Sequence, residues 1–263
     1  MYSKLHNIFA DKTGGDIFVC YGLWHWFYII ATIATIATLI YLFKNKEQSV
    51  KEKVLKVLIG LAFGLYIADF FLIPFAYGEI DVDKLPFHAC TAMCTIGFIS
   101  NYNSFLKKYR LNFALIGLVS NIMYLSYPSG VMSYEISPLS YRAVQTLLFH
   151  SIMTVYGLMV LTFEEGGPQI KRCYRDVAIL GILAVWSIIG NALYSGSADD
   201  YSRDFNWFFV KSDPFGLLPE EWARYVLPQI NIIAFFAAEM LFYLAFMFIN
   251  KKIKQTKKEL QPA

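Results

Sequence analysis

Long apolar segments recur along the chain, and this feature constrains the fold more than any other. Runs of roughly 20 residues, each long enough to cross a hydrocarbon core as a helix, alternate with short segments that carry nearly all the charge. Only 16% of the 263 residues are charged and 57% are hydrophobic, whereas a soluble domain carries about 25% charged residues. The pattern excludes a soluble enzyme, a disordered protein and a disulfide-stapled secreted domain. It also excludes an outer-membrane β-barrel, whose strands are alternating segments of about ten residues.

The apolar runs predict an all-α polytopic membrane helix bundle with about seven transmembrane helices. We place the spans at residues 22–43, 55–77, 85–105, 111–128, 143–163, 177–195 and 225–249. The third of these is interrupted by Asn101 and Asn103. The predicted organisation is an extracytoplasmic N-terminal segment (1–21), one seven-helix membrane domain (22–250) and a basic cytoplasmic tail (251–263), with no cleaved signal peptide.

The distribution of basic residues predicts the orientation of the bundle. The segments after the first, third and fifth spans, together with the C-terminal tail and with Lys56 at the start of the second span, hold 16 of the 23 Lys and Arg residues. Because basic residues favour the cytoplasmic side, we expect the N-terminus outside and the C-terminus in the cytoplasm. Trp24, Trp26, Trp207 and Trp222 then lie near the outer boundary, as in an aromatic belt. The net charge of +3 reflects this orientation, and no nucleic-acid partner is predicted.

The spacing of the cysteines and the absence of glycosylation signals bear on metal binding and on the source of the protein. The four cysteines form no CxxC pair and no His-x₃-His spacing occurs, so neither a metal site nor another cofactor is predicted. No N-x-S/T sequon is present, which favours a bacterial source. The expected location is the plasma membrane of a bacterial cell, with membrane lipids as partners, and the sequence leaves the oligomeric state open.

A few ionisable and polar residues lie inside or at the ends of the predicted spans. Burying an ionisable group in a bilayer costs about 2.5 kcal/mol or more, so such residues usually face the bundle interior and serve a function. The set comprises Asp69, Glu239, His25, His88, His150, Asn121, Asn191 and Asn231. Most of them lie toward the outer side, which favours a water-accessible polar cavity that opens outward. The alternative is a set of hydrogen bonds that join neighbouring helices.

The third span gives the most detailed prediction. In a regular helix His88 and Thr91 share one face, and Cys90 points about 200° away from His88. The partner of a histidine base is therefore expected from another helix, such as His150 in the fifth span. Histidine suits general-base chemistry, and a neighbouring hydroxyl or thiol is a candidate nucleophile. The alternative is that both histidines only bond to the backbone or to each other.

The last outer loop, residues 196–224, differs from the other loops. It mixes acidic residues with an aromatic cluster at Phe205, Trp207, Phe208 and Phe209. This composition is typical of a segment that lies in the membrane interface or covers the cavity as a lid, although an ordinary interfacial loop is an equal alternative.

Three short motifs resemble those of the YwaF-like family of bacterial integral membrane proteins. Leu85-Pro86-Phe87-His88-Ala89-Cys90 resembles the LPxHxC opening of the family's third helix, and Phe149-His150 resembles its second histidine motif. Asn191, followed by Asn206-Trp207-Phe208-Phe209-Val210-Lys211 before Pro214, is similar to its N…NYxFLxxKP segment. The resemblance covers roughly residues 20–250.

The resemblance implies a serpentine helix bundle related to eukaryotic phospholipid-remodelling acyltransferases, and distantly to androgen-induced-type proteins that hydrolyse lipid esters with an intramembrane Thr and His. The eukaryotic acyltransferases carry a cysteine immediately before the first histidine. Here that position is Phe87, so either Cys90 or Thr91 replaces the missing nucleophile or the activity does not carry over to this chain.

The leading hypothesis is an intramembrane lipid acyltransferase or lipid esterase that acts on a phospholipid or lipoprotein acyl group. His150 is the expected base, His88 assists, Thr91 or Cys90 is the nucleophile, and Asp69 orients a histidine. Candidate substrate-binding residues are Asn121, Asn191, Asn206, Trp207, Asn231 and Glu239. The alternative is a transporter or ligand-binding membrane protein that uses its intramembrane Asp, Glu and His residues for proton or cation coupling.

Overall fold

The computed structural model describes residues 16–77, 82–132, 136–164, 167, 169–194, 206–209 and 218–259. Every regular element within these residues is a helix, which confirms the predicted all-α bundle. The chain divides into two compact units, Met1–Phe163 and Glu164–Ala263, and each unit is described by itself.

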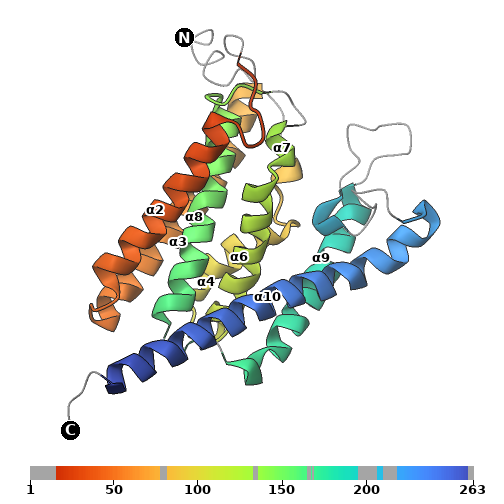
Figure 1. Ribbon diagram of the computed structural model, residues 1–263. Coiled ribbons are helices and arrows are strands. Elements are labelled where there is room, and N and C mark those ends of the chain that lie inside the picture. Colours follow the sequence, from red (N-terminus) through yellow and green to blue (C-terminus); the bar gives the residue numbers. More distant parts are fainter. Residues whose placement is uncertain are drawn as a thin grey trace. The chain divides into compact units, whose positions relative to one another are not determined.

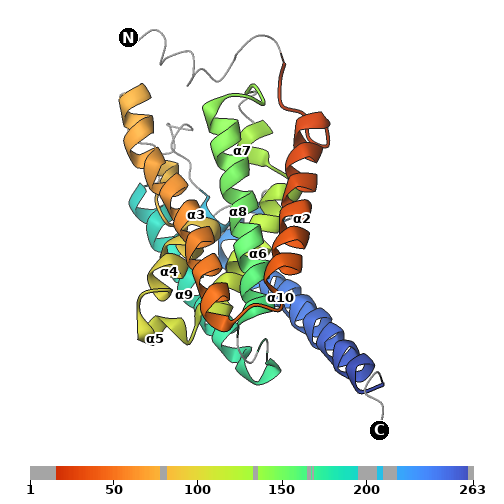
Figure 2. The same cartoon turned by 90° about the vertical axis from the view of Figure 1, so that its left-hand side faces the viewer.

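The first unit is a bundle in which α8 is the central helix. Its elements are α2 (Leu23–Phe43), α3 (Gln48–Tyr77), η1 (Val82–Lys84), α4 (Ala89–Ser100), α5 (Ser104–Lys107), α6 (Arg110–Ser126), α7 (Ser129–Met132) and α8 (Tyr141–Phe163) (Figure 1). α8 packs against α6, α3, α2 and α4, and Figure 2 shows it between α3 and α2. Because other helices surround α8, its polar residues lie in the interior of the unit.

A glycine allows α6 and α8 to approach each other closely. A Cβ atom added at Gly157 would lie 2.7 Å from the Cβ of Leu118 and 2.9 Å from the carbonyl oxygen of Ala114. No side chain fits in this space, so glycine sets the distance between the two helices. The helices run antiparallel, because Leu118 meets Gly157 while Asn121, further along α6, meets the earlier residue His150.

Six described helices are long and apolar enough to cross a membrane, namely α2, α3, α6, α8, α9 and α10. The predicted third span is the exception, because α4 has 12 residues and is about 18 Å long at the usual rise per residue. His88 has an extended backbone, so the helix begins only at Ala89. Asn101 ends it, and the Asn103 side chain caps α5 by accepting from two backbone N–H groups. The described residues therefore contain six such helices where seven were predicted, and the difference lies in residues 85–105, which these asparagines interrupt.

One end of the first unit is held together by an ion pair between a buried arginine and a partly exposed glutamate. Arg110, the first residue of α6, is 1% exposed and donates to both carboxylate oxygens of Glu52 on α3, at 2.7 and 2.6 Å. Arg110 also donates to Asn101, which in turn donates to the Tyr156 hydroxyl on α8. Four helices are thus joined at one level. We call the opposite end, where Asp69 lies, the outer end, following the predicted orientation.

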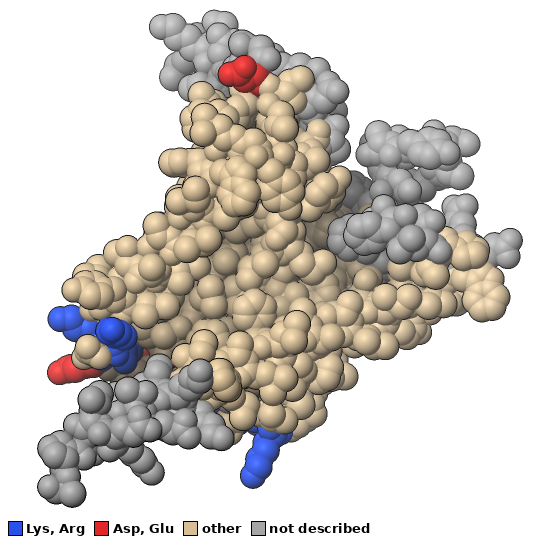
Figure 3. Space-filling view, viewed as in Figure 1, with Lys and Arg blue, Asp and Glu red and all other residues tan. Residues whose placement is uncertain are grey.

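α2 exposes a broad apolar surface. Leu23, Ile30 and Ile33 are all more than half exposed, and the helix has a mean hydropathy of 2.0. Figure 3 shows this face almost free of charge, with charged side chains gathered near the turn between α2 and α3, where Lys44 and Lys46 are exposed. An apolar face of this kind suits contact with lipid acyl chains.

The second unit consists of two long helices and a short segment that they hold. Its elements are η2 (Ile170–Arg172), α9 (Tyr174–Tyr194), η4 (Trp207–Phe209) and α10 (Glu220–Glu259). Near the beginning of α9, Asp176 accepts a hydrogen bond from the Tyr243 hydroxyl on α10 at 3.1 Å. At the other end of α9, Asn191 contacts η4, which also contacts Asn231 on α10. The two helices therefore run antiparallel.

Candidate active site

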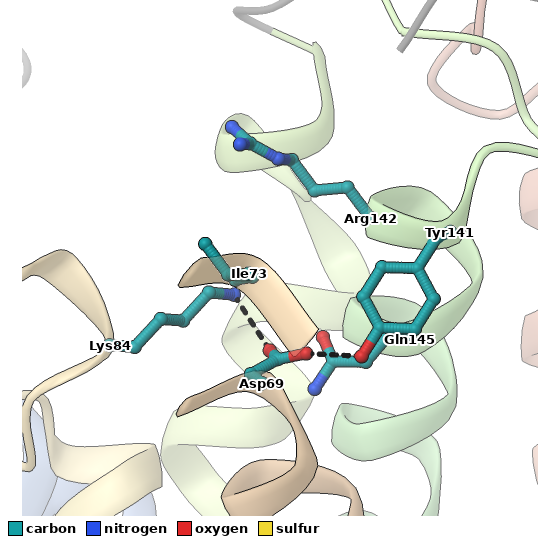
Figure 4. A pocket seen from close by; sticks show the side chains of 6 residues that line it. All are labelled: Asp69, Ile73, Lys84, Tyr141, Arg142 and Gln145. Atoms are coloured by element: carbon teal, nitrogen blue, oxygen red, sulfur yellow. Dashed lines mark hydrogen bonds and ion pairs between the residues drawn. The ribbon is translucent and has the colours of Figure 1, made fainter. Parts of the chain in front are cut away.

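Asp69 joins three elements at the outer end of the first unit. Its carboxylate, which is 1% exposed, accepts a hydrogen bond from the Tyr141 hydroxyl at 2.6 Å and lies 3.4 Å from the ammonium group of Lys84 (Figure 4). Tyr141 begins α8 and Lys84 ends η1. Asp69 therefore fixes the segment before α4 relative to α3 and α8.

A shallow depression surrounds this carboxylate. It is lined by Asp69, Ile73, Lys84, Tyr141, Arg142 and Gln145, and the space within it, including open solvent, is about 200 Å³. The Gln145 amide donates to the carbonyl of Leu65 on α3 at 3.3 Å. Figure 4 shows that the Arg142 side chain points away from Asp69. Within the depression, therefore, Lys84 pairs with the Asp69 carboxylate, whereas the Arg142 guanidinium group lies away from it.

The segment that carries His88 is attached to α3 at two points. Besides the Asp69 contact, the Tyr66 hydroxyl donates to the backbone carbonyl of Lys84 at 2.8 Å, and the Phe87 side chain is buried. His88 has φ −76° and ψ 148°, so it precedes the first turn of α4 rather than belonging to it. The separation of about 200° between His88 and Cys90 was predicted for a regular helix, so it does not apply to this segment.

His150 lies in the interior of the unit, enclosed by aromatic and polar neighbours. Its Nδ1 atom is 2.6 Å from the side-chain oxygen of Asn121 on α6. The ring of Tyr124, also on α6, stacks on it with centroids 3.7 Å apart and planes 12° from parallel, and Phe149 meets it edge-on. His150 is therefore held by two residues of α6, while His88 lies in the extended segment before α4.

The candidate nucleophiles differ in how their polar groups are occupied. The Thr91 hydroxyl donates to the carbonyl of His88 at 3.2 Å, and Thr154 similarly donates to the carbonyl of His150. Cys94 is fully buried, whereas Cys90 is half-buried and lies in the first turn of α4. Tyr66 interacts electrostatically with both thiols. Cys90 is thus the more accessible thiol of the pair.

Asn191 and Asn231 hold the backbone of η4 in the second unit. The Asn191 side chain accepts from the N–H of Trp207 at 3.0 Å and donates to its carbonyl at 3.1 Å. Asn231 donates to the carbonyl of Phe208 at 2.8 Å. These bonds hold Phe208 at φ 56°, a conformation that non-glycine residues rarely adopt. The Trp207 side chain is fully buried and Asn206 is half-buried, while Phe205 lies outside the described residues.

Glu239 is the second intramembrane acid, on α10. Its side chain is fully buried, and neither carboxylate oxygen has a hydrogen-bond partner among the described residues. It interacts electrostatically with Asp176 on α9 and with Tyr243, one turn further along α10. Of the six residues predicted to bind substrate, Asn121 lies in the first unit and the other five lie in the second.

His25 joins two helices rather than lining a cavity. Its Nδ1 atom accepts a hydrogen bond from the backbone N–H of Tyr21 at 2.8 Å, so Nε2 carries the proton and donates to the carbonyl of Leu125 at 2.6 Å. Both nitrogens are occupied by backbone groups. His25 therefore forms hydrogen bonds that join neighbouring helices, which is the alternative to a polar cavity given above.

Several contributors to the site were not predicted from the sequence. Lys84, Tyr66 and Tyr141 surround Asp69, and Tyr124 stacks on His150. Helical spacing carried a signal for two of them, because Tyr66 and Tyr124 each lie three residues from a predicted site residue, Asp69 and Asn121. For metal binding, no group of three or more His, Cys, Asp and Glu side chains in the described part of the chain is arranged to hold an ion.

Comparison with known proteins gives one match. A model of the TMEM164 family matches residues 20–250. No curated protein and no solved structure shows significant similarity to the chain.

Proposed function

The chain belongs to the TMEM164 family, a family of membrane proteins, and we propose that it is an intramembrane lipid-modifying enzyme that hydrolyses or transfers an acyl group. The substrate class is a membrane phospholipid or a lipoprotein acyl group. One observation carries the proposal: His150 is buried in the interior of the first unit, where Asn121 engages its Nδ1 atom at 2.6 Å and the Tyr124 ring stacks on it, which leaves Nε2 as the nitrogen for proton transfer. The resemblance of the flanking motifs to YwaF-like proteins supports the same chemistry.

The proposed roles follow from the contacts of each group. His150 acts as the base through Nε2, because Nδ1 is engaged by Asn121. Cys90 is the nucleophile, since its thiol is half-buried while the Thr91 hydroxyl already donates to the backbone. The first-turn N–H groups of α4 face no partner within the helix and stabilise negative charge. Asp69 and Lys84 hold the segment that carries His88.

The reaction proceeds in two balanced steps. The Cys90 sulfur attacks the ester carbonyl carbon, His150 accepts the thiol proton, and the proton passes to the departing alkoxide, which leaves as an alcohol. The product of this step is a thioester on Cys90. A water molecule or the hydroxyl of a second lipid then attacks the thioester and gives up its proton to His150, and the cysteine thiol is regenerated. Water gives hydrolysis, and a lipid hydroxyl gives acyl transfer.

The test is acyl release or transfer from radiolabelled phospholipids by the purified protein in lipid nanodiscs. We expect activity in the wild type and a loss of about 10² or more in His150→Ala. Cys90→Ser is expected to lose activity as strongly, whereas Thr91→Val is expected to keep it. Cys173→Ser, which changes a half-buried cysteine of the second unit, is the matched control and is expected to stay active. Undiminished turnover in both His88→Ala and His150→Ala would contradict the assigned roles.

A second candidate function, proton or cation coupling, is favoured by one observation in the second unit. Glu239 is fully buried with no hydrogen-bond partner among the described residues, and buried carboxyl groups of this kind often mark ion or proton pathways. Proteoliposomes with an internal pH-sensitive dye test this function. Proton movement that Glu239→Gln abolishes would support transport, and an unchanged dye signal in the wild type would count against it.

A further inference from the structure

We propose that Asn121 is a positioning residue that determines which nitrogen of His150 is available for proton transfer. The inference rests on the proposed function, in which His150 is the base. It assigns Asn121 a role different from the substrate contact predicted from the sequence.

The orientation of the Asn121 amide is set by its own helix. Its NH₂ group donates to the carbonyl oxygen of Gly117, one turn earlier on α6, at 2.6 Å. The amide oxygen therefore points the other way, toward α8, where it lies 2.6 Å from Nδ1 of His150. Since an amide oxygen can only accept, Nδ1 must carry the proton. Asn121 is fully buried and His150 is 5% exposed, so water does not compete for this bond.

A neutral imidazole has one protonated nitrogen and one unshared electron pair. With the proton on Nδ1, the electron pair of His150 lies on Nε2. Tyr124, three residues after Asn121 and on the same face of α6, stacks on the ring at 3.7 Å and fixes its plane. Two residues of α6 therefore determine both the tautomer and the direction of the basic nitrogen.

The contact between Asn121 and His150 resembles the contact that orients the histidine in many catalytic sites. In nucleophile–histidine pairs, a third side chain usually bonds to the histidine nitrogen that does not react, and asparagine serves this role as well as aspartate. Asparagine orients the ring without adding a negative charge. In this chain Asn121 holds His150 in this way, and the nucleophile is the Cys90 of the proposed function.

The chain contains an internal reference for the opposite tautomer. His25 accepts at Nδ1 from a backbone N–H and donates from Nε2 to a backbone carbonyl. Nitrogen chemical shifts distinguish the two tautomers of histidine. A protein labelled with ¹⁵N-histidine is therefore expected to show His150 protonated at Nδ1 and His25 protonated at Nε2 in one spectrum, with signals assigned from His150→Gln and His25→Gln.

The test compares variants of α6 by this spectrum and by acyl-transfer kinetics. Asn121→Leu is expected to lose the Nδ1-protonated form of His150 and to lower kcat by about 10², with a smaller change in KM. Asn121→Asp keeps an acceptor toward Nδ1 but loses the bond to the Gly117 carbonyl, and it is expected to retain the tautomer. Ser120→Ala is the matched control, because Ser120 donates to the same Gly117 carbonyl but does not contact His150.

The outcomes separate this inference from the function on which it rests. A wild-type spectrum with His150 protonated at Nε2, or a tautomer unchanged in Asn121→Leu, would overturn the positioning role even if the enzyme is active. A spectrum with His150 protonated at Nδ1 in a protein that has no acyl-transfer activity would overturn the proposed function. The effect of Asn121 on the His150 ring would then still stand. Thermal unfolding of Asn121→Leu checks that the variant is folded.

Discussion

Replacing Gly157 with alanine tests whether the contact between α6 and α8 sets the geometry of the candidate site. The added Cβ would lie 2.7 Å from the Cβ of Leu118, about 0.7 Å short of the 3.4 Å at which ordinary contact begins. It would also lie 2.9 Å from the backbone oxygen of Ala114, which cannot rotate away. The two helices must therefore separate.

The expected loss of stability combines two opposing effects. Overpacking a close helix contact costs about 1–3 kcal/mol, and the greater helix preference of alanine offsets up to about 1 kcal/mol of this cost. We expect Gly157→Ala to lower the free energy of unfolding by about 1–2 kcal/mol. A separation of about 0.7 Å would also lengthen the 2.6 Å contact between Asn121 and His150 toward the limit of a hydrogen bond.

The assay uses the buried thiol of Cys94 as a reporter of unfolding. Cys94 is fully buried in α4, so a thiol-reactive dye labels it only when the first unit opens. The other three cysteines are replaced by serine for this measurement. Gly64→Ala is the matched control, because a Cβ at Gly64 on α3 meets nothing within 4 Å. This control is expected to be neutral or stabilising by up to about 1 kcal/mol.

Equal labelling rates in Gly157→Ala and Gly64→Ala would refute the reasoning, because they would show that α6 and α8 accommodate the methyl group without cost. A destabilised Gly157→Ala that keeps full acyl-transfer activity would refute only the second part, the link between helix distance and the His150 site.

Three further substitutions test other contacts. Arg110→Met should lower the free energy of unfolding by about 3 kcal/mol, because it removes the buried guanidinium group from Glu52 and Asn101 and leaves Glu52 with the more distant Lys107. The double variant with Glu52→Leu should recover part of this loss, and thermal unfolding of the wild type and both variants measures it. His25→Leu should cost about 1–3 kcal/mol by leaving two backbone groups unpaired, again measured by unfolding; an unchanged midpoint would contradict it. At Phe208, which has φ 56°, the glycine variant should be about 1 kcal/mol more stable than the alanine variant, and equal stabilities would show that the backbone there is not strained.

The periodicity of the sequence was sufficient to predict the membrane helices. Apolar runs gave six of the spanning helices, with ends that agree to within about seven residues, because burial in a bilayer requires long uninterrupted apolar segments. The third span was predicted too long because hydropathy does not register backbone conformation. His88 is extended and Asn101 ends α4, so the apolar stretch is only partly helical. The polar residues His88 and Asn101 at the two ends of this short apolar run were the sequence signal that the helix is short.

The candidate site was predicted in its residue types but not in its contacts. His88, His150 and Asp69 were identified because ionisable groups are rare inside a membrane. Their partners could not be predicted, since Tyr141 and Lys84 are ordinary residues at helix ends whose position depends on tertiary packing. The same limit applies to Arg110, which lies in a basic turn of the sequence and yet is buried against Glu52.

The ion pair between Glu52 and Arg110 also constrains how the protein is made. The two residues are 58 positions apart in the chain, so the ribosome completes α3 and α4 before the guanidinium group on α6 exists. Until then Glu52 on α3 and Asn101 at the end of α4 have no guanidinium group to join them. The contact that links α3, α4, α6 and α8 at this level can therefore form only after α6 and α8 have emerged, so this end of the first unit assembles late and as a group.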